Sequence, residues 1–256
     1  MRNDSSSPGL KALIIHLARA ENRRAQVANL RASLPCPSEI VWAVDARAPA
    51  AEGQEGDGGT HVHSHLTPRY PYALRDTEVA CFRSHRKSWQ RIVDEGLEAA
   101  LVLEDDVALE RAVFDRALAL AMSAVRPGDF IRFPYKRRED AGRVVAQEGE
   151  MVLRLPEEVA LGMQVQLVTR GAAERLLRAT EVFDRPVDCL LQMPWVHGAR
   201  VLTVWPSGVS EESGDLGGST IGHKALGWDK IRREILRPLY RRRIARLSQD
   251  YFASQP

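Results

Sequence analysis

The chain has 256 residues, enough for one large core, and its 44% hydrophobic and 27% charged residues are usual for a soluble globular protein, which excludes wholesale disorder. No apolar run approaches the ~20 residues that span a bilayer, and residues 1–10, which we expect to be disordered, lack the apolar segment of a secretory signal, so we expect a cytoplasmic protein. The net charge is only +2, and the three cysteines lack metal-ligand spacing, which favours reduced, buried thiols over a metal site.

The first part of the chain alternates strand and helix patterns. An apolar run at 12–17 predicts a strand, the charged pattern that follows through Arg31 predicts a helix, and residues 39–44 predict a second strand that ends at Asp45. Strands and helices that alternate at this spacing predict a parallel α/β sheet. Residues 46–60 lack periodicity and predict a mobile loop.

Three histidines follow this loop at every second position. On a strand, His61, His63 and His65 would share one face and could bind a metal ion. A polar loop edge is the preferred interpretation.

The sharpest feature of the sequence is a strand that ends in three carboxylates. After a helix that we expect to be capped by Asp76 or Thr77 and to stop at Gly96, residues 99–103 form an apolar run typical of a buried strand, and Glu104-Asp105-Asp106 follows directly. In open α/β sheets, ligands bind beyond the carboxyl ends of the strands. Carboxylates there can hold Mg²⁺ or Mn²⁺, which neutralises a departing diphosphate. A solvated acidic turn is the alternative interpretation of the triplet alone.

The second half of the chain predicts further elements of the same domain. They are a helix at 110–125, a strand at 129–133, a hairpin at 143–155, a strand at 159–168, a helix capped by Thr169 and a strand at 200–205. We expect one domain over 11–222 and a separate helical tail over 223–256.

The tail is strongly basic. From Lys224 to Phe252 the charge is +6, whereas the rest of the chain carries −4, which favours a localised contact with an anionic surface over nucleic-acid binding. Pro238 is expected to divide the tail into two helices. Apolar residues recur at helical spacing and would suit the inner face of an anionic membrane: Trp228, Ile231, Ile235, Tyr240, Ile244, Leu247 and Tyr251. The alternative is a last helix docked on the core, with solvated arginines.

Several motifs occur together, in one order and at consistent spacing, between Lys11 and Ser210. They are Ile14-Ile15-His16-Leu17-Ala18-Arg19 with Arg23 and Arg24, Ala43-Val44-Asp45-Ala46, Glu78-Val79-Ala80-Cys81-Phe82-Arg83-Ser84-His85, Leu101-Val102-Leu103-Glu104-Asp105-Asp106, Thr169-Arg170-Gly171-Ala172-Ala173-Glu174-Arg175-Leu176-Leu177 and Pro186-Val187-Asp188. In this set the chain resembles glycosyltransferase family 25, the lipopolysaccharide-biosynthesis transferases that also include collagen galactosyltransferases. It departs from the usual family residues at His16, Ala46 and Ala80, where Asn or Gly is more common.

The resemblance implies a GT-A-like α/β fold, Rossmann-like, with a mixed sheet flanked by helices. It further implies an inverting transfer of a sugar, with UDP-galactose the favoured donor, onto lipopolysaccharide or another cell-surface glycan precursor, which includes lipid-linked acceptors.

We assign roles to the acidic residues first. Asp106, with Glu104 beside it, is the expected ligand of Mn²⁺ or Mg²⁺, while one carboxylate of the triplet is expected to face the donor instead. Asp188 is the expected catalytic base, because deprotonating the acceptor hydroxyl requires a carboxylate within hydrogen-bond reach. A helix N-cap after Pro186 is the alternative for Asp188.

The remaining candidates are donor contacts. The resemblance places Ser84 and His85 at the nucleotide, and Asp45 at the uridine; Glu104 and Asp105 are further donor candidates. Arg19 and Arg23 suit the diphosphate, although a solvated helix face would also explain them. The run Lys136-Arg137-Arg138 could contact an anionic acceptor.

Two other function classes remain open from the sequence. One is a metal-dependent nucleotidyltransferase or phosphotransferase, which is disfavoured because no Gly-rich phosphate loop is present. The other is a peripheral membrane or anionic-polymer binding module that uses the basic tail.

Overall fold

The structure is a computed structural model that describes residues 9–47, 58–212 and 228–255, with side chains from Leu236 onward in the last segment. The expected disorder of residues 1–8 and most of the expected loop at 46–60 lie outside the described residues. So do the tail residues before 228 and the side chains of Trp228, Ile231 and Ile235. Within the described residues, no helix has the length and apolar character needed to cross a membrane.

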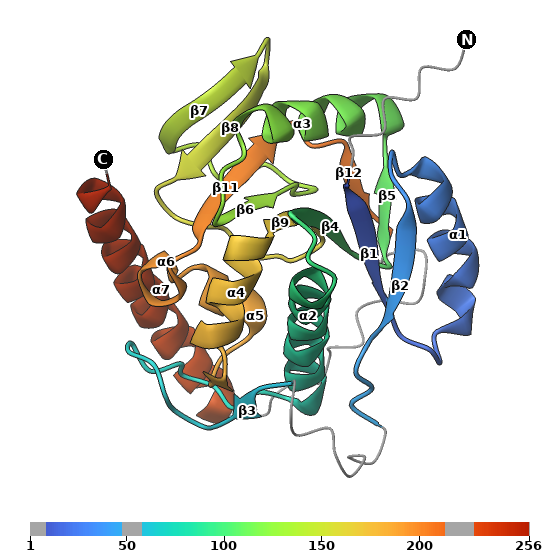
Figure 1. Cartoon of the computed structure of the whole chain (residues 1–256). Coiled ribbons are helices and arrows are strands. Elements are labelled where there is room, and N and C mark those ends of the chain that lie inside the picture. Colours follow the sequence, from blue (N-terminus) through green and yellow to red (C-terminus); the bar gives the residue numbers. More distant parts are fainter. Residues whose placement is uncertain (1–8, 48–57, 213–227, 256) are drawn as a thin grey trace, which may run out of the picture.

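A mixed sheet of eight strands, in the order β2-β1-β4-β9-β6-β11-β8-β7, forms the centre of the molecule (Figure 1). Its strands are β1 (Lys11–His16), β2 (Ser38–Trp42), β4 (Ala99–Glu104), β6 (Asp129–Arg132), β7 (Gly142–Glu148), β8 (Met151–Pro156), β9 (Val165–Thr169) and β11 (Arg200–Trp205). Strands β2, β1 and β4 run parallel, as expected for a β-α-β alternation, and β6 pairs in parallel with β11. Strand β9 lies antiparallel between β4 and β6. The expected α/β fold with a mixed sheet is confirmed.

Helices cover both faces of this sheet. One face packs against α1 (Arg24–Ser33) and α3 (Arg111–Ala124), and the other against α2 (Asp76–Asp94), α4 (Arg170–Ala179) and α5 (Val187–Leu191). The buried strands carry apolar residues on both sides, so each face contributes its own core. Smaller elements complete the fold: η1 (Glu21–Arg23), α6 (Pro194–His197), a pair formed by β3 (Thr60–His61) and β10 (Val182–Phe183), and a pair formed by β5 (Val107–Leu109) and β12 (Val209–Glu211).

The topology brings several strand ends to one edge of the sheet. The carboxyl ends of β1, β2 and β4 lie together because these strands are parallel. Because β9 is antiparallel to β4, its first residue, Val165, pairs with Leu103 at this same edge. Polar residues from strands distant in sequence therefore meet beside Glu104.

Two local expectations for the helices and strands are wrong. Helix α2 is capped by Arg75, not by Asp76 or Thr77, because the Glu78 side chain accepts the Arg75 backbone N–H in a capping box. The strand expected at 159–168 begins only at Val165. Gly162 has a φ of +119°, outside the range of regular strands, and residues 159–164 form a loop instead.

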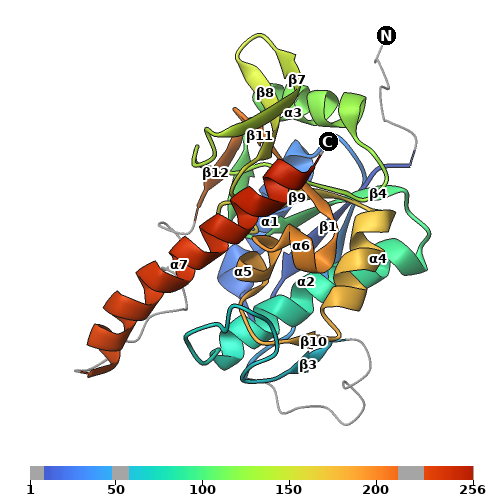
Figure 2. The same ribbon diagram turned by 90° about the vertical axis from the view of Figure 1, so that its left-hand side faces the viewer.

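The C-terminal helix α7 (Trp228–Ser254) lies across one side of the molecule, over α5 and α6 (Figure 2). It is one helix with Pro238 inside it, so the expected division into two helices is wrong. The residues after Pro238 pack on the core: Ile244 is buried, the Ser248 hydroxyl donates to the Glu157 carbonyl, and the Tyr240 hydroxyl accepts from Arg185 Nη1 at 3.1 Å. This packing offsets the backbone hydrogen bond that an interior proline removes.

The apolar face that we expected to meet a membrane therefore faces the protein in the second half of α7. Of the predicted set, Ile244 is buried, and Tyr240 and Tyr251 are half-buried against the core. Exposed arginines occupy the outer side of the helix: Arg237, Arg241, Arg242, Arg243 and Arg246. The docked-helix interpretation holds for this part of the tail.

Replacing Ile244 by Ala is expected to lower the free energy of unfolding by ~2–5 kcal/mol, because the substitution leaves a cavity under α7. Leu239→Ala is the matched control on the same helix, since Leu239 is 55% exposed and should change stability by less than ~0.5 kcal/mol. Denaturant unfolding of both variants measures the difference. Equal and small losses would show that α7 does not contribute to the folded core.

Candidate active site

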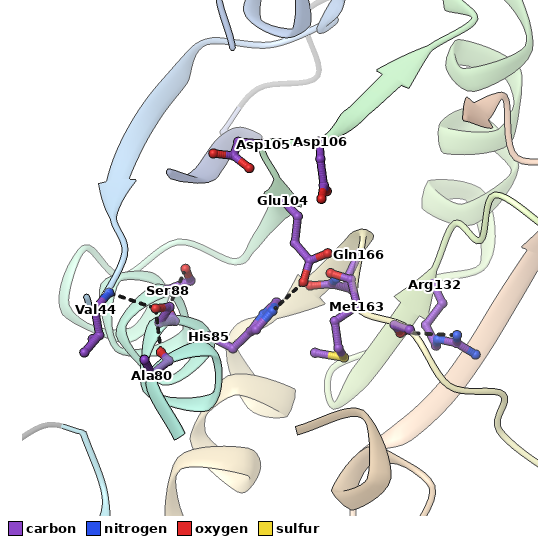
Figure 3. A network of polar contacts seen from close by, with 12 residues as sticks. Val44, Ala80, His85, Ser88, Glu104, Asp105, Asp106, Arg132, Met163 and Gln166 are labelled. Atoms are coloured by element: carbon purple, nitrogen blue, oxygen red, sulfur yellow. Dashed lines mark hydrogen bonds and ion pairs between the residues drawn. The ribbon is translucent and has the colours of Figure 1, made fainter. Parts of the chain in front are cut away.

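The acidic triplet lies at the edge of the sheet where the strand ends meet. Figure 3 shows Glu104 directed toward His85 of α2 and Gln166 of β9, with Asp106 on the same side and Asp105 directed away. A segment distant in the sequence also holds this turn, because the Glu212 backbone N–H donates to the Asp106 carbonyl at 2.8 Å. The three consecutive carboxylates therefore lie in different environments.

Asp105 is used within the protein. It is 6% exposed, one oxygen lies 2.6 Å from His16 Nδ1, and the other accepts from Arg23 Nη1 at 2.5 Å. His16 comes from the end of β1 and is itself buried. Asp105 therefore connects the acidic turn to the end of β1 and to η1, and both of its carboxylate oxygens have partners within the protein.

Asp105→Ala is expected to destabilise the fold by ~3–5 kcal/mol, because it leaves the buried His16 and the half-buried Arg23 without their common partner. Asp250→Ala, which removes an exposed carboxylate from α7, is the matched control and should stay within ~0.5 kcal/mol of wild type. Chemical denaturation of the two variants provides the comparison. A cost below ~1 kcal/mol for Asp105→Ala would contradict the anchoring role.

The surroundings of Asp106 disfavour its ionised form. Burial, followed by the negative charge of Glu104, raises its pKa to about 6 from the ordinary 3.8, although Arg23 Nη1 lies 3.5 Å from its carboxylate and acts in the other direction. Since the folded pKa lies above the ordinary value, ionisation of Asp106 costs stability above pH 6, and this cost is relieved as the pH falls toward 4. A pair of carboxylates with this mutual repulsion suits a divalent cation, which would compensate both charges.

Glu104 has a neighbouring histidine. His85 is buried in α2, and its Nε2 lies 3.4 Å from Glu104 Oε1, while its Nδ1 is buried without a partner among the described residues. Together with Cys81, these residues form a group whose possible ligand atoms lie within 4.8 Å of one another. Burial raises the pKa of the Cys81 thiol strongly, so the thiolate that a soft metal requires is disfavoured. The donor set of Glu104 and Asp106 fits a hard cation better than this triad fits a soft one.

Asp188 lies near the triplet in space. It is half-buried in the first turn of α5, where its Oδ1 accepts the Cys189 backbone N–H at 2.8 Å, and the Gly162 backbone also donates to it. Burial, with the negative charge of Glu104, raises its pKa, and the guanidinium of Arg132 acts in the opposite direction. The N-cap of α5 is Pro186, so the helix-cap alternative for Asp188 is wrong. The negative charge of Glu104 thus contributes to the raised pKa of Asp188 as well as to that of Asp106.

The predicted donor contacts at the second strand are paired with each other. Arg19 Nε donates to Asp45 Oδ2 at 2.8 Å, and the Arg47 backbone N–H donates to the other oxygen, which together lower the pKa of Asp45. The Ser84 hydroxyl accepts from Val44 N at 2.9 Å and donates to the Ala80 carbonyl. Ser84 is buried, so its hydroxyl positions the segment that carries Asp45 and is not directed at a ligand.

Arg23, the other basic donor candidate, lies at the acidic turn. It bridges Asp105 and Asp106 and supplies the positive charge beside them. The structure thus groups the predicted site residues into an acidic centre, made of Glu104, Asp106, Asp188 and His85 with Arg23, and a separate pair at the end of β2.

Two side chains at this site, Gln166 and Arg132, had no role in the sequence analysis. Gln166 is fully buried in β9 beside Glu104, and its Oε1 has no partner among the described residues. Buried Arg132 pairs with Glu139 and donates to the carbonyls of Leu161 and Gly162, which supports the loop over Asp188. A polar residue inside an apolar strand was the available signal for Gln166, as it was for His16 at the end of β1.

The histidine series does not form a metal site. His61 belongs to the two-residue strand β3 and stacks near Phe183, while His63 and His65 are exposed in the turn that follows. The three rings are not among the clusters of possible ligands within the described residues. The expected loop edge is correct for His63 and His65, whereas His61 lies on β3. The three cysteines, all within the described part of the chain, are unpaired, as expected.

Comparison with known proteins agrees with this arrangement. Residues 10–191 match the family described as glycosyltransferase family 25 (LPS biosynthesis protein). Procollagen galactosyltransferase 1 of Danio rerio is 32% identical over 116 residues, which are 45% of this chain and 19% of that protein. A probable inactive glycosyltransferase 25 family member 3 of Bos taurus is 29% identical over 187 residues, 70% of this chain and 30% of the relative. The chain thus spans less than a third of the length of these relatives.

Proposed function

The chain belongs to glycosyltransferase family 25, and from this premise we propose that it transfers a sugar from a nucleotide-sugar donor to a hydroxyl group of a glycan. Among the relatives are proteins named inactive, so family membership alone does not make this chain an enzyme. The observation that supports activity is the acidic centre, in which the negative charge of Glu104 acts on both Asp106 and Asp188.

In this proposal Glu104 and Asp106 hold Mn²⁺ or Mg²⁺, and His85 orients Glu104 through the contact at 3.4 Å. The bound cation would neutralise the charge that develops on the departing nucleoside diphosphate. Asp105 keeps the turn in place through His16 and Arg23, so that the two ligands need little reorganisation.

Asp188 is the proposed base. A carboxylate with a raised pKa takes a proton more readily than an ordinary one, which suits removal of the proton from the attacking acceptor hydroxyl. The hydroxyl oxygen then bonds to the anomeric carbon as the bond to the diphosphate breaks, and the anomeric configuration inverts.

The finer assignments are proposals as well. UDP-galactose is the favoured donor, supported by relatives named procollagen galactosyltransferases. The family description supports lipopolysaccharide or another cell-surface glycan as the acceptor class. We further propose a cytoplasmic location with a peripheral contact to the anionic inner membrane surface through the exposed arginines of α7.

A thermal-shift screen of UDP-, ADP- and GDP-sugars, with Mn²⁺ and with EDTA, tests the function. A ligand at ~100 times its dissociation constant adds ~2.7 kcal/mol to the stability of the fold. We expect UDP-galactose to raise the melting temperature in Mn²⁺ and not in EDTA. A protein that no nucleotide sugar stabilises would contradict the proposal and favour a binding module, whereas stabilisation by free nucleotides alone would favour the nucleotidyltransferase class.

A further inference from the structure

A groove of about 260 Å³ lies between α7 and the surface beside the candidate active site. Its lining includes Leu161, Gln192 and Ile244, and two arginines from different parts of the chain, Arg138 after β6 and Arg241 on α7. The groove is not part of the acidic centre. Arg138 belongs to the basic run 136–138 that we expect to contact an anionic acceptor, and Arg241 is one of the exposed arginines of α7.

The two arginines of the groove lack carboxylate partners among the described residues. Arg138 is steadied by neutral acceptors, because its Nη2 donates to the Tyr135 hydroxyl at 3.3 Å and its Nη1 to the Leu161 carbonyl at 3.5 Å. Arg241 is exposed on α7. The neighbouring Arg137 differs, since it forms an ion pair with Asp140.

One acidic residue, Glu158, also lines the groove, and its carboxylate accepts from the Gln249 amide at 3.1 Å. Two guanidinium groups and one carboxylate therefore line the groove, which gives it a net positive charge. Guanidinium groups recognise phosphate oxygens through paired, charge-assisted hydrogen bonds.

Two residues that line the groove are close in sequence to residues that position Asp188. Gln192 is the C-cap of α5, the short helix that carries Asp188, and Leu161 precedes Gly162, whose backbone donates to Asp188. On the α7 side, Tyr240 precedes Arg241 and packs at 5.5 Å against Tyr70. A molecule whose hydroxyl reaches Asp188 could thus extend a second group between the two arginines.

We propose that this groove binds a phosphate or diphosphate group carried by the acceptor, with Arg138 and Arg241 as its ligands. The inference rests on the proposed function, which it makes more specific: the acceptor is a phosphorylated molecule. The phosphate can belong to the glycan or to a lipid carrier, and the chemistry at the arginines is the same for both.

Titration calorimetry with inorganic pyrophosphate in EDTA tests the groove apart from the metal-dependent donor site. The double variant Arg138→Gln/Arg241→Gln is expected to weaken pyrophosphate binding at least tenfold. Arg126→Gln/Arg178→Gln removes the same charge from exposed positions outside the groove and should stay within twofold of wild type. Equal losses in both double variants, or no binding to wild type at millimolar pyrophosphate, would overturn the proposal.

One further measurement distinguishes a lipid phosphate from a glycan phosphate, and another distinguishes failure of the groove proposal from failure of the proposed function. Flotation with vesicles of phosphatidylcholine and phosphatidic acid, lost in the groove variant and kept in the control, would identify a lipid phosphate; pyrophosphate binding without flotation would identify a phosphorylated glycan. The groove variant should keep the Mn²⁺-dependent thermal shift with UDP-sugar. A wild-type protein that binds pyrophosphate in the groove and shows no such shift would leave the anion site standing and contradict the proposed function.

Discussion

Asp106→Asn is expected to reduce the rate of sugar transfer by ~10³-fold or more while leaving the fold intact. The substitution keeps the shape of the side chain and removes one of the two charges proposed to hold the cation, whose stabilisation of the leaving group corresponds to several kcal/mol. Because ionised Asp106 is desolvated and lies near Glu104, the variant should be at least as stable as wild type at pH 7. Initial rates with UDP-galactose and Mn²⁺, together with a melting curve, measure both effects.

Asp250→Asn serves as the control for Asp106→Asn, since it removes an exposed carboxylate from α7 and should retain wild-type turnover. A rate for Asp106→Asn within a few fold of wild type would remove Asp106 from the proposed metal site. Loss of activity accompanied by a fall in melting temperature would instead assign the residue a structural role, which the adjacent Asp105 already has.

Asp188→Asn is expected to lower turnover by ~10²–10⁴-fold with little change in donor affinity, because a general base acts on the acceptor hydroxyl. An amide oxygen can still accept the Cys189 and Gly162 backbone N–H groups, so the local structure should persist. Turnover and the dissociation constant of UDP-galactose are measured separately. The exposed residue Asp94 at the end of α2 provides the control substitution Asp94→Asn. If donor affinity falls as far as turnover, Asp188 belongs to the donor site.

The parts of the fold that follow a local pattern were predictable from the sequence. The apolar run that becomes β4, the parallel strands β1 and β2, the hairpin of β7 and β8 and the Thr169 cap of α4 all depend on residues close together in the chain. The pair of β5 and β12 was not predictable, because each strand has three residues and they are about a hundred positions apart. Glu212, the residue after β12, nevertheless makes the backbone hydrogen bond to Asp106 in the acidic turn.

The acidic centre was predicted as a set of residue types, whereas their division of labour came from the fold. Nothing in Glu104-Asp105-Asp106 distinguishes the middle carboxylate. It is set apart by His16, which lies 89 positions away and reaches it because β1 and β4 are adjacent parallel strands. For the same reason the tail pattern did not distinguish a membrane-facing helix from one docked on the core, since both bury the same side of α7.

Titration calorimetry of UDP into the wild-type protein, once with Mn²⁺ and once with EDTA, tests the central claim most directly. If Glu104 and Asp106 bind a cation that contacts the diphosphate, UDP should bind at least ~100-fold more tightly with Mn²⁺, a difference of ~2.7 kcal/mol in binding free energy. Asp106→Asn should abolish that difference. Equal affinity for UDP in Mn²⁺ and in EDTA would contradict a metal-dependent donor site at the end of β4.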